Sequence, residues 1–252
     1  MEANPYEVTD TVGQPLPTYN RVALTPIKYM QRSYRMIEGQ YFLFLGITIC
    51  ALIIGSIGPF GILLGPMITG LYLCFLEKES GATAKFETLF QGFEHFIPTL
   101  LVMLTMLLCN FLFTLTIMGL AALAVIIFAP LGGNAVPASF IAIAFAVSYS
   151  VLLLLSFLVF IPFSFCFQLI AEHKLSAGAA IQTSARAARH NLFPLLAIYF
   201  CLSFFGFVAA LFCYLPVFFL MPIQIGATFI LYRDTFPKLS DSGAASPFPS
   251  SP

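Results

Sequence analysis

Long apolar stretches and short polar stretches alternate along this chain. A helix needs about 20 apolar residues to cross the roughly 30 Å hydrocarbon core of a bilayer. Six stretches lack Lys, Arg, Asp, Glu and His, and they cover residues 41–58, 61–76, 97–129, 135–171, 192–214 and 217–232. The second is short for a full crossing at about 1.5 Å per residue. The pattern predicts an all-α integral membrane bundle of six transmembrane helices.

Three polar stretches carry apolar or small residues at helical spacing. In the first, basic residues lie between the apolar ones, which predicts an amphipathic helix in the membrane interface. The alternative is a helix packed on the protein's own cytoplasmic loops. The second is expected to be another interfacial helix, and the third a helix with a stripe of small residues. The three stripes are Ile27, Met30, Tyr34, Ile37 and Tyr41; Phe86, Leu89, Phe90, Phe93 and Phe96; and Ala177, Ala180, Ile181, Ser184 and Ala188.

The charges are unevenly distributed, although they sum to zero. Charged residues make up 9% of the chain and apolar residues 60%, against roughly 25% charged residues in soluble domains. With six spans, every Lys and Arg lies before the first span, after the last, or in the loops at 77–94 and 172–191. Because cytoplasmic segments are enriched in Lys and Arg, both termini are expected in the cytoplasm. The tails 1–20 and 238–252 have the composition of disordered segments, which leaves one membrane domain at 21–237.

Two parts of the chain resemble each other. The segment that begins at Ser33 and the one that begins at Ser184 share Ser, Arg, an amide side chain, Phe, Leu and Ile at a constant offset. A Pro-x-x-x-Gly follows in each copy, as Pro66 with Gly70 and as Pro222 with Gly226. We therefore predict a parallel internal repeat, with copies at 27–78 and 177–234 on either side of a long helical hairpin at 97–171.

The paired prolines suggest a candidate pocket. Proline cannot donate a helical hydrogen bond, so Pro66 and Pro222 are each expected to leave a carbonyl unpaired one turn earlier. Such a carbonyl in hydrocarbon needs protein, water or ligand to satisfy it. We predict that spans two and six face each other, with Thr69 and Gln224 near a shared polar pocket. The alternative is two helix kinks filled by packing. The candidate pocket residues are Pro66, Thr69, Gly70, Pro222, Gln224 and Gly226.

The sequence argues against catalysis. No Asp, Glu, Lys, Arg or His lies inside a predicted span, which disfavours a proton-driven pump. No metal-ligand spacing, phosphate-binding loop or nucleophile motif occurs, so we expect no enzyme activity, no metal, no cofactor and no nucleic-acid partner. Arg35, Arg186 and Arg189 are candidate contacts for anionic lipid head groups. The alternative is that these arginines only set the topology.

The chain resembles a family of uncharacterised bacterial multi-pass inner-membrane proteins. The residues that carry the resemblance are Gly65-Pro66 with Gly70, the segments 86–93 and 180–191, and the terminal run 232–236, Y-R-D-T-F. A looser similarity is to the membrane region that precedes some glycerophosphodiester phosphodiesterases. The resemblance implies a bacterial inner-membrane location and little chemistry.

These observations predict a class of function rather than a reaction. The expected role is non-enzymatic: handling a lipid or a small apolar solute, or scaffolding a membrane complex. The alternative is a transporter or channel built on the duplicated two-span module. Expected partners are membrane lipids, a second copy of the chain, or another membrane protein.

Overall fold

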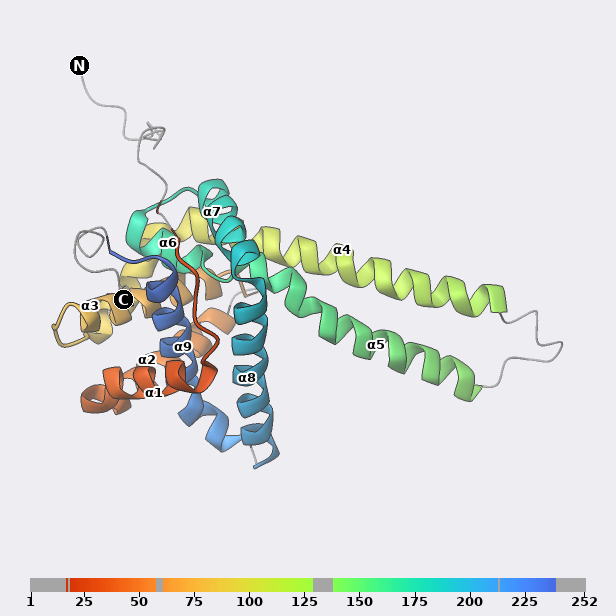
Figure 1. The fold of residues 1–252 in the computed structure, drawn as a ribbon, viewed down its shortest axis with the longest axis horizontal. Coiled ribbons are helices and arrows are strands. Elements are labelled where there is room, and N and C mark those ends of the chain that lie inside the picture. The colour runs from red at the N-terminus through yellow and green to blue at the C-terminus, as the bar shows by residue number, and fades with distance from the viewer. Residues whose placement is uncertain (1–16, 18, 58–60, 129–137, 213, 239–252) are drawn as a thin grey trace, which may run out of the picture.

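The computed structural model of this protein describes residues 17, 19–57, 61–128, 138–212 and 214–238, which form helices and no strands. Figure 1 shows a group of packed helices, here called the head, and a helical hairpin, here called the arm, that projects from it along the longest axis. The arm is residues 104–128 and 138–160, which belong to α4 (Phe96–Phe128) and α5 (Ala138–Phe160). The other described residues form the head.

The head contains most of the helical elements, and some of them come from before the arm and some from after it. In chain order they are α1 (Pro26–Ile37), η1 (Glu38–Gln40), α2 (Tyr41–Ser56), α3 (Leu64–Glu79), η3 (Phe86–His95), the start of α4, η5 (Ile161–Phe163), α6 (Cys166–His173), α7 (Ala177–His190), α8 (Leu192–Leu211) and α9 (Leu215–Thr235). The elements η1, η3 and η5 are 3₁₀ helices. The expected tails lie almost wholly outside the described residues.

Five segments of the described chain are long and apolar enough to cross a membrane, as expected for a membrane protein. These segments are Pro26–Ser56, Phe86–Leu123, Ile141–His173, Leu192–Leu211 and Leu215–Thr235. The predicted second span is not among them. It forms α3, whose 16 residues reach only about 24 Å at 1.5 Å per residue.

The predicted fourth span, 135–171, is interrupted in the head. The helix α5 ends at Phe160, a single 3₁₀ turn with Pro162 in its first positions follows, and α6 begins at Cys166. Proline lacks the N–H that a continuing helix would use. The apolar residues of α6 are buried in the head, including Leu169 and Ile170, which are fully buried. An apolar run therefore made an arm helix and a core helix rather than one long span.

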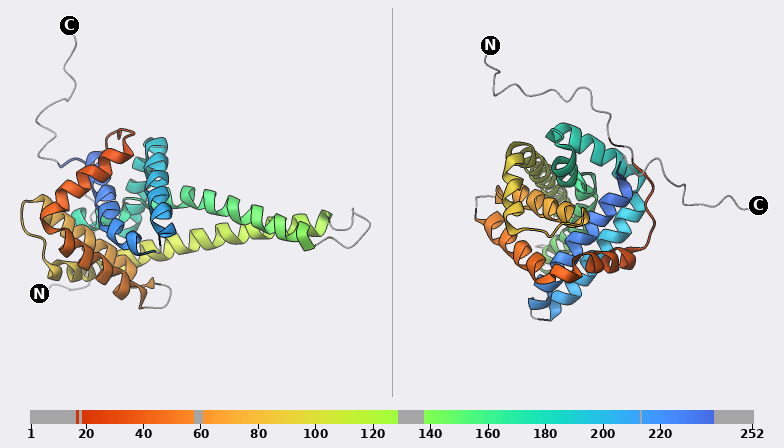
Figure 2. Two further views of the ribbon diagram at one scale, coloured as in Figure 1. Left: turned by 90° about the horizontal axis from the view of Figure 1, so that it is seen from below. Right: turned by 90° about the vertical axis from the view of Figure 1, so that its left-hand side faces the viewer.

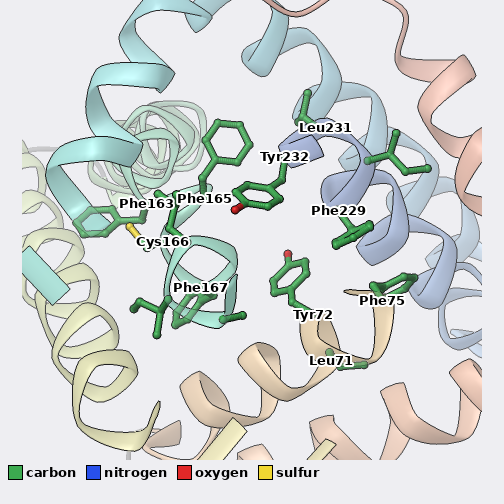
Figure 3. Packing of buried hydrophobic residues seen from close by; sticks show 14 of the residues in the cluster. Leu71, Tyr72, Phe75, Phe163, Phe165, Cys166, Phe167, Phe229, Leu231 and Tyr232 are labelled. Atoms are coloured by element: carbon green, nitrogen blue, oxygen red, sulfur yellow. The ribbon is translucent and has the colours of Figure 1, made fainter. Parts of the chain in front are cut away.

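The tightest packing joins α3 to η3, and it depends on two glycines. A Cβ added to Gly70 would overlap the carbonyl oxygen of Leu89, and one added to Gly92 would overlap that of Pro66. The backbones of the two elements therefore touch directly. An apolar core extends from this contact: Figure 3 shows Tyr72 and Phe75 of α3 near Phe229 and Tyr232 of α9, with Phe165 on the other side of Tyr232.

The helix α1, which covers the first predicted amphipathic stretch, shares only Ile37 between its buried face and the predicted stripe. Tyr29, Ser33 and Ile37 are the buried residues of α1, and the Ser33 hydroxyl donates to the carbonyl of Ile223 on α9 at 2.8 Å. Part of the predicted stripe, including Ile27 and Tyr34, is exposed. The helix is thus docked on α9 and still presents apolar side chains outward.

The arm differs from the head in burial and in direction. None of the arm side chains that the structure describes is buried, and Phe111, Leu115 and Ile126 are each about 60% exposed or more. The views of Figures 1 and 2 agree that α8 runs crosswise to the arm. One flat bilayer therefore cannot be crossed lengthwise by both α8 and the arm in this arrangement.

Candidate functional site

Charged residues from distant parts of the chain meet around Arg233, near the end of α9. Its Nε lies 2.9 and 2.8 Å from the two carboxylate oxygens of Glu79, and its Nη1 lies 2.7 and 2.8 Å from those of Glu172. The hydroxyl of Tyr232 donates to Glu172 at 2.6 Å. Lys238 forms an ion pair with Glu79 at 3.1 Å. Two carboxylates and two cations thus balance within one cluster, here called the Arg233 cluster.

The Arg233 cluster lies where the two ends of the described chain come together. The guanidinium of Arg32 on α1 contacts both oxygens of Asp234 at 2.6 and 3.0 Å. The backbone N–H of Asn20 donates to the carbonyl of Thr235 at 2.8 Å. The four segments that carry the positive charges were expected on one side of the membrane, and all four meet at these ion pairs.

A cavity of about 640 Å³ lies between the base of the arm and the head. The helices α2, α3, α4, α5, α8 and α9 all contribute to its wall. Most of the wall is apolar, and its members include Ala51, Leu64, Met67, Leu71, Phe157 and Ile225. Three lining residues, Asn110, Phe160 and Ser203, are exposed, so the cavity is open at this edge.

Several polar side chains line the same cavity, and three of them, Tyr72, Thr228 and Gln224, form hydrogen bonds that join neighbouring helices. The hydroxyls of Tyr72 and Thr228 lie 3.0 Å apart and tie α3 to α9. With the Gln168 amide on α6 oriented so that both of its ends find partners, its oxygen accepts from the Tyr72 hydroxyl at 2.9 Å. The Gln224 amide nitrogen donates to the carbonyl of Leu202 at 2.9 Å, which joins α9 to α8.

The structure separates the candidate pocket residues of the first copy from this cavity. The backbones of Pro66 and Gly70 pack against η3, as described above. The Thr69 side chain is fully buried, and its hydroxyl donates to the carbonyl of Gly65 at 3.0 Å. Thr69 is not among the residues that line the cavity, whereas its neighbours Ile68 and Leu71 are.

The candidate residues of the second copy lie on the cavity or close to it. Gln224 lines the cavity. Pro222 and Gly226 are buried on α9 two residues before and after it and do not line the cavity. A Cβ at Gly226 would overlap the Ser33 hydroxyl, so this glycine leaves room for α1. The close approach at both glycines is therefore to other parts of this chain: η3 at Gly70 and α1 at Gly226.

The two prolines differ in their helices. Pro66 lies in the first turn of α3, which begins at Leu64, so its missing N–H removes no bond from the helix interior. Pro222 lies inside α9 and does interrupt the helical bonding. The hydroxyl of Tyr41 donates to the nearby carbonyl of Phe219 at 2.5 Å, so side chains from neighbouring helices contact α9 where the proline disturbs it.

The candidate lipid contacts lie on two different helices. Arg35 is exposed on α1 and borders a surface hollow of about 410 Å³ together with Arg32 and Arg233. Arg186 and Arg189 are exposed on α7, whereas small residues of that helix such as Ala180 and Ser184 are buried. Three exposed arginines are thus available to a membrane surface, in two places rather than one patch.

Sequence reasoning missed the Arg233 cluster and the role of Tyr72. The Y-R-D-T-F run at 232–236 was a sequence signal for the Arg233 cluster, but the run does not indicate that Glu79 and Glu172 are the partners. A tyrosine in the apolar stretch 61–76 was the only signal for the second. Among the described residues, no group of three His, Cys, Asp or Glu side chains is arranged to hold a metal.

Comparison of the chain with protein-family models, with curated protein sequences and with solved structures finds no match. The cavity and the Arg233 cluster therefore have to be interpreted from their own geometry.

Proposed function

We propose that the protein is a non-enzymatic integral membrane protein that holds a lipid acyl chain or a small apolar solute in the cavity at the base of the arm. The observation that carries this proposal is the cavity itself. Its volume of about 640 Å³ lies within the roughly 300–1,000 Å³ of small-molecule sites. Its mostly apolar wall and open edge suit a chain-like apolar molecule that enters from the side.

The cavity is suited to binding rather than to a reaction. The lining residues include hydroxyl and amide side chains but no Asp, Glu, His, Lys, Arg or Cys. General acid–base catalysis and nucleophilic catalysis usually depend on such groups. The acidic residues nearest in the fold, Glu79 and Glu172, are occupied by Arg233.

We further propose that the chain crosses a bacterial inner membrane six times, with both termini in the cytoplasm. The meeting of Asn20 with Thr235, and of Arg32 with Asp234, supports termini on the same side. This topology requires the arm to turn relative to the head, because α8 runs crosswise to it. It also requires the bilayer to thin around the short helix α3.

Reporter fusions test this topology. Fusions after Glu79, Lys174 and Lys238 should be active only as cytoplasmic reporters. A fusion after Asn134, which lies outside the described residues, should be active only as a periplasmic reporter. A cytoplasmic signal at Asn134 would contradict the six-span proposal.

The internal repeat is also retained as a proposal. Each copy consists of an amphipathic helix, an apolar helix and a helix with Pro-x-x-x-Gly: α1, α2 and α3 in one, and α7, α8 and α9 in the other. The different placements of Pro66 and Pro222 show that such copies would have diverged in their third helix.

Mass spectrometry of the protein purified in a mild detergent tests the binding function. The informative variant is Gly206→Leu: a Cβ at Gly206 would meet only the Gln224 amide nitrogen, at 3.4 Å, so the side chain would extend into the cavity. Gly46→Leu is the matched control, because Gly46 is an exposed helical glycine with nothing within 4 Å of an added Cβ. We expect a defined co-purifying molecule in the wild type and control, and at least a tenfold loss in Gly206→Leu. Equal recovery from all three proteins would refute the proposal.

A further inference from the structure

The wall of the cavity carries hydrogen-bonding groups but no formal charge. We propose that its ligand is a neutral amphiphile, with an apolar body and a hydroxyl or carbonyl head that is bound by Asn110 and Gln224. This inference rests on the proposed function and names the chemical class of the ligand. On this inference, anionic phospholipids do not bind in the cavity, and only the exposed arginines are available to contact them.

Asn110 has unused hydrogen-bonding capacity at the open edge of the cavity. Its side-chain amide offers two donors and one acceptor oxygen. Its backbone carbonyl accepts from Thr114, but its side chain forms no hydrogen bond with any other residue that the structure describes. Asn110 is exposed, and in an arm that spans the membrane such an amide would meet hydrocarbon without a partner, which is costly; a ligand hydroxyl or carbonyl removes that cost.

Gln224 supplies a second group on the wall of the cavity. Its amide nitrogen donates to the carbonyl of Leu202, and this bond fixes which end of the amide points where. The amide oxygen is left to accept from a ligand hydroxyl. Tyr72 and Thr228 are already engaged with each other, so they close the inner wall rather than compete for the head.

A charged head group has no partner inside this cavity. The nearest cation along α9 is Arg233, nine residues after Gln224 and therefore about 13 Å away along the helix. Arg233 is itself paired with two carboxylates. An ionised group moved out of water without a counter-charge costs several kcal/mol, whereas a hydroxyl that gains two hydrogen bonds does not incur that cost. The cavity is therefore expected to bind neutral ligands in preference to charged ones.

Two photoactivatable lipids with the same acyl chains test this inference. One is a diacylglycerol, whose head is a hydroxyl, and the other is the corresponding phosphatidate. Each is added to the full-length protein in nanodiscs of phosphatidylcholine, and cross-linked peptides are mapped by mass spectrometry. We expect at least tenfold more labelling of cavity residues by the diacylglycerol.

Asn110→Leu tests the assigned residue, and Thr105→Val is its control. Thr105 is exposed on the same helix, and its hydroxyl bonds back to the carbonyl of Leu101. We expect Asn110→Leu to reduce diacylglycerol labelling about tenfold and to reduce the preference over phosphatidate, while Thr105→Val changes neither. Because Asn110 is exposed, the head should fold normally in this variant.

The possible outcomes separate this inference from the function on which it rests. Equal labelling by both lipids in the wild type, abolished by Gly206→Leu, would refute the neutral-ligand inference and leave the proposed function standing. Unchanged labelling in Asn110→Leu would refute the role of Asn110, and a loss of self-association in that variant would assign the amide to a second copy of the chain instead. Absence of cavity labelling by either lipid, together with no co-purifying molecule, would refute both proposals.

Discussion

The head and the arm are both apolar, but they are held in shape by different means. In the head, large side chains such as Phe75 and Tyr232 are fully buried, and the Arg233 cluster fixes segments far apart in the sequence. In the arm, no described side chain is buried, and side-chain hydrogen bonds such as that from Thr114 to Asn110 return to its own backbone. The head therefore specifies its own packing, whereas the arm depends on what surrounds it.

This difference shows which part of the molecule needs the bilayer most. Exposed apolar surface is unfavourable in water at about 25 cal/mol per Å², so a free-standing arm is stable only where lipid or another apolar partner covers it. The outer face of α8 makes the same demand, since Phe193 and Phe207 are 79% and 64% exposed. The core around α3 makes no such demand, because it is covered by η3, α6 and α9.

The largest expected effect contrasts a glycine of the head with one of the arm. Gly70→Ala would force the backbones of α3 and η3 apart, and we expect it to lower the free energy of unfolding by at least about 3 kcal/mol. Gly119→Ala in α4 meets nothing within 4 Å and should be neutral or slightly stabilising, because alanine favours helix. Thermal unfolding in detergent measures both. Similar losses in the two variants would contradict the contrast between head and arm.

A charge placed in the arm tests its environment. Leu115→Arg adds an arginine to a 60% exposed position in α4 and should disfavour membrane insertion of the arm by about 3 kcal/mol. The fraction of arm inserted is measured by modification of a cysteine at the arm tip. The control Leu115→Phe should insert normally. Full insertion of the arginine variant would show that protein or water, not lipid, covers this face.

Removal of the central cation of the Arg233 cluster tests the head. Arg233→Gln leaves Glu79 and Glu172 without their main partner, and we expect a loss of about 2 kcal/mol in unfolding free energy. This is below the value for a fully buried pair, because the two carboxylate side chains are 25% and 20% exposed. Arg35→Gln, at an exposed position, serves as the control and should change stability by less than about 0.5 kcal/mol. A stable Arg233→Gln protein would mean that the cluster does not hold the head together.

The smallest expected effect concerns the ion pair between Arg32 and Asp234. Both side chains are substantially exposed, at 53% and 33%, so Arg32→Gln should cost about 0.5 kcal/mol, and less in high salt. The measurement is unfolding at two salt concentrations. A loss above 2 kcal/mol would show that this pair, rather than the Arg233 cluster, is the main tie between the two ends of the chain.

The sequence predicted the elements better than it predicted their packing. Apolar run length located α2, α4, α8 and α9 to within a few residues, because run length and charge are local properties. The interruption at Pro162 was missed because the run 135–171 stays apolar through it.

Part of the candidate site was also predictable. Gln224 does line the cavity. It was recognisable in the sequence because an amide in an apolar span must find a polar partner, which here is the carbonyl of Leu202. Thr69 does not line the cavity. The contact of Gly70 with η3 decides which side of α3 faces the cavity, and no local sequence pattern encodes that contact. Asn110 was visible in the sequence, but its place on the same cavity wall as Gln224 depends on how the arm meets the head.

The contacts at Asn20 determine when, during synthesis, the head can finish folding. The Asn191 side chain accepts from the N–H of Val22 at 3.0 Å and donates to the carbonyl of Asn20 at 3.0 Å, across 169 and 171 residues of chain. Thr235, whose carbonyl accepts from the backbone N–H of Asn20, is made almost last. At about 5–20 residues per second, the ribosome needs roughly 10–40 s to produce them after Asn20 emerges. The first helix, α1, therefore waits without its main neighbour α9 through most of synthesis, and the head closes only when the chain is nearly finished.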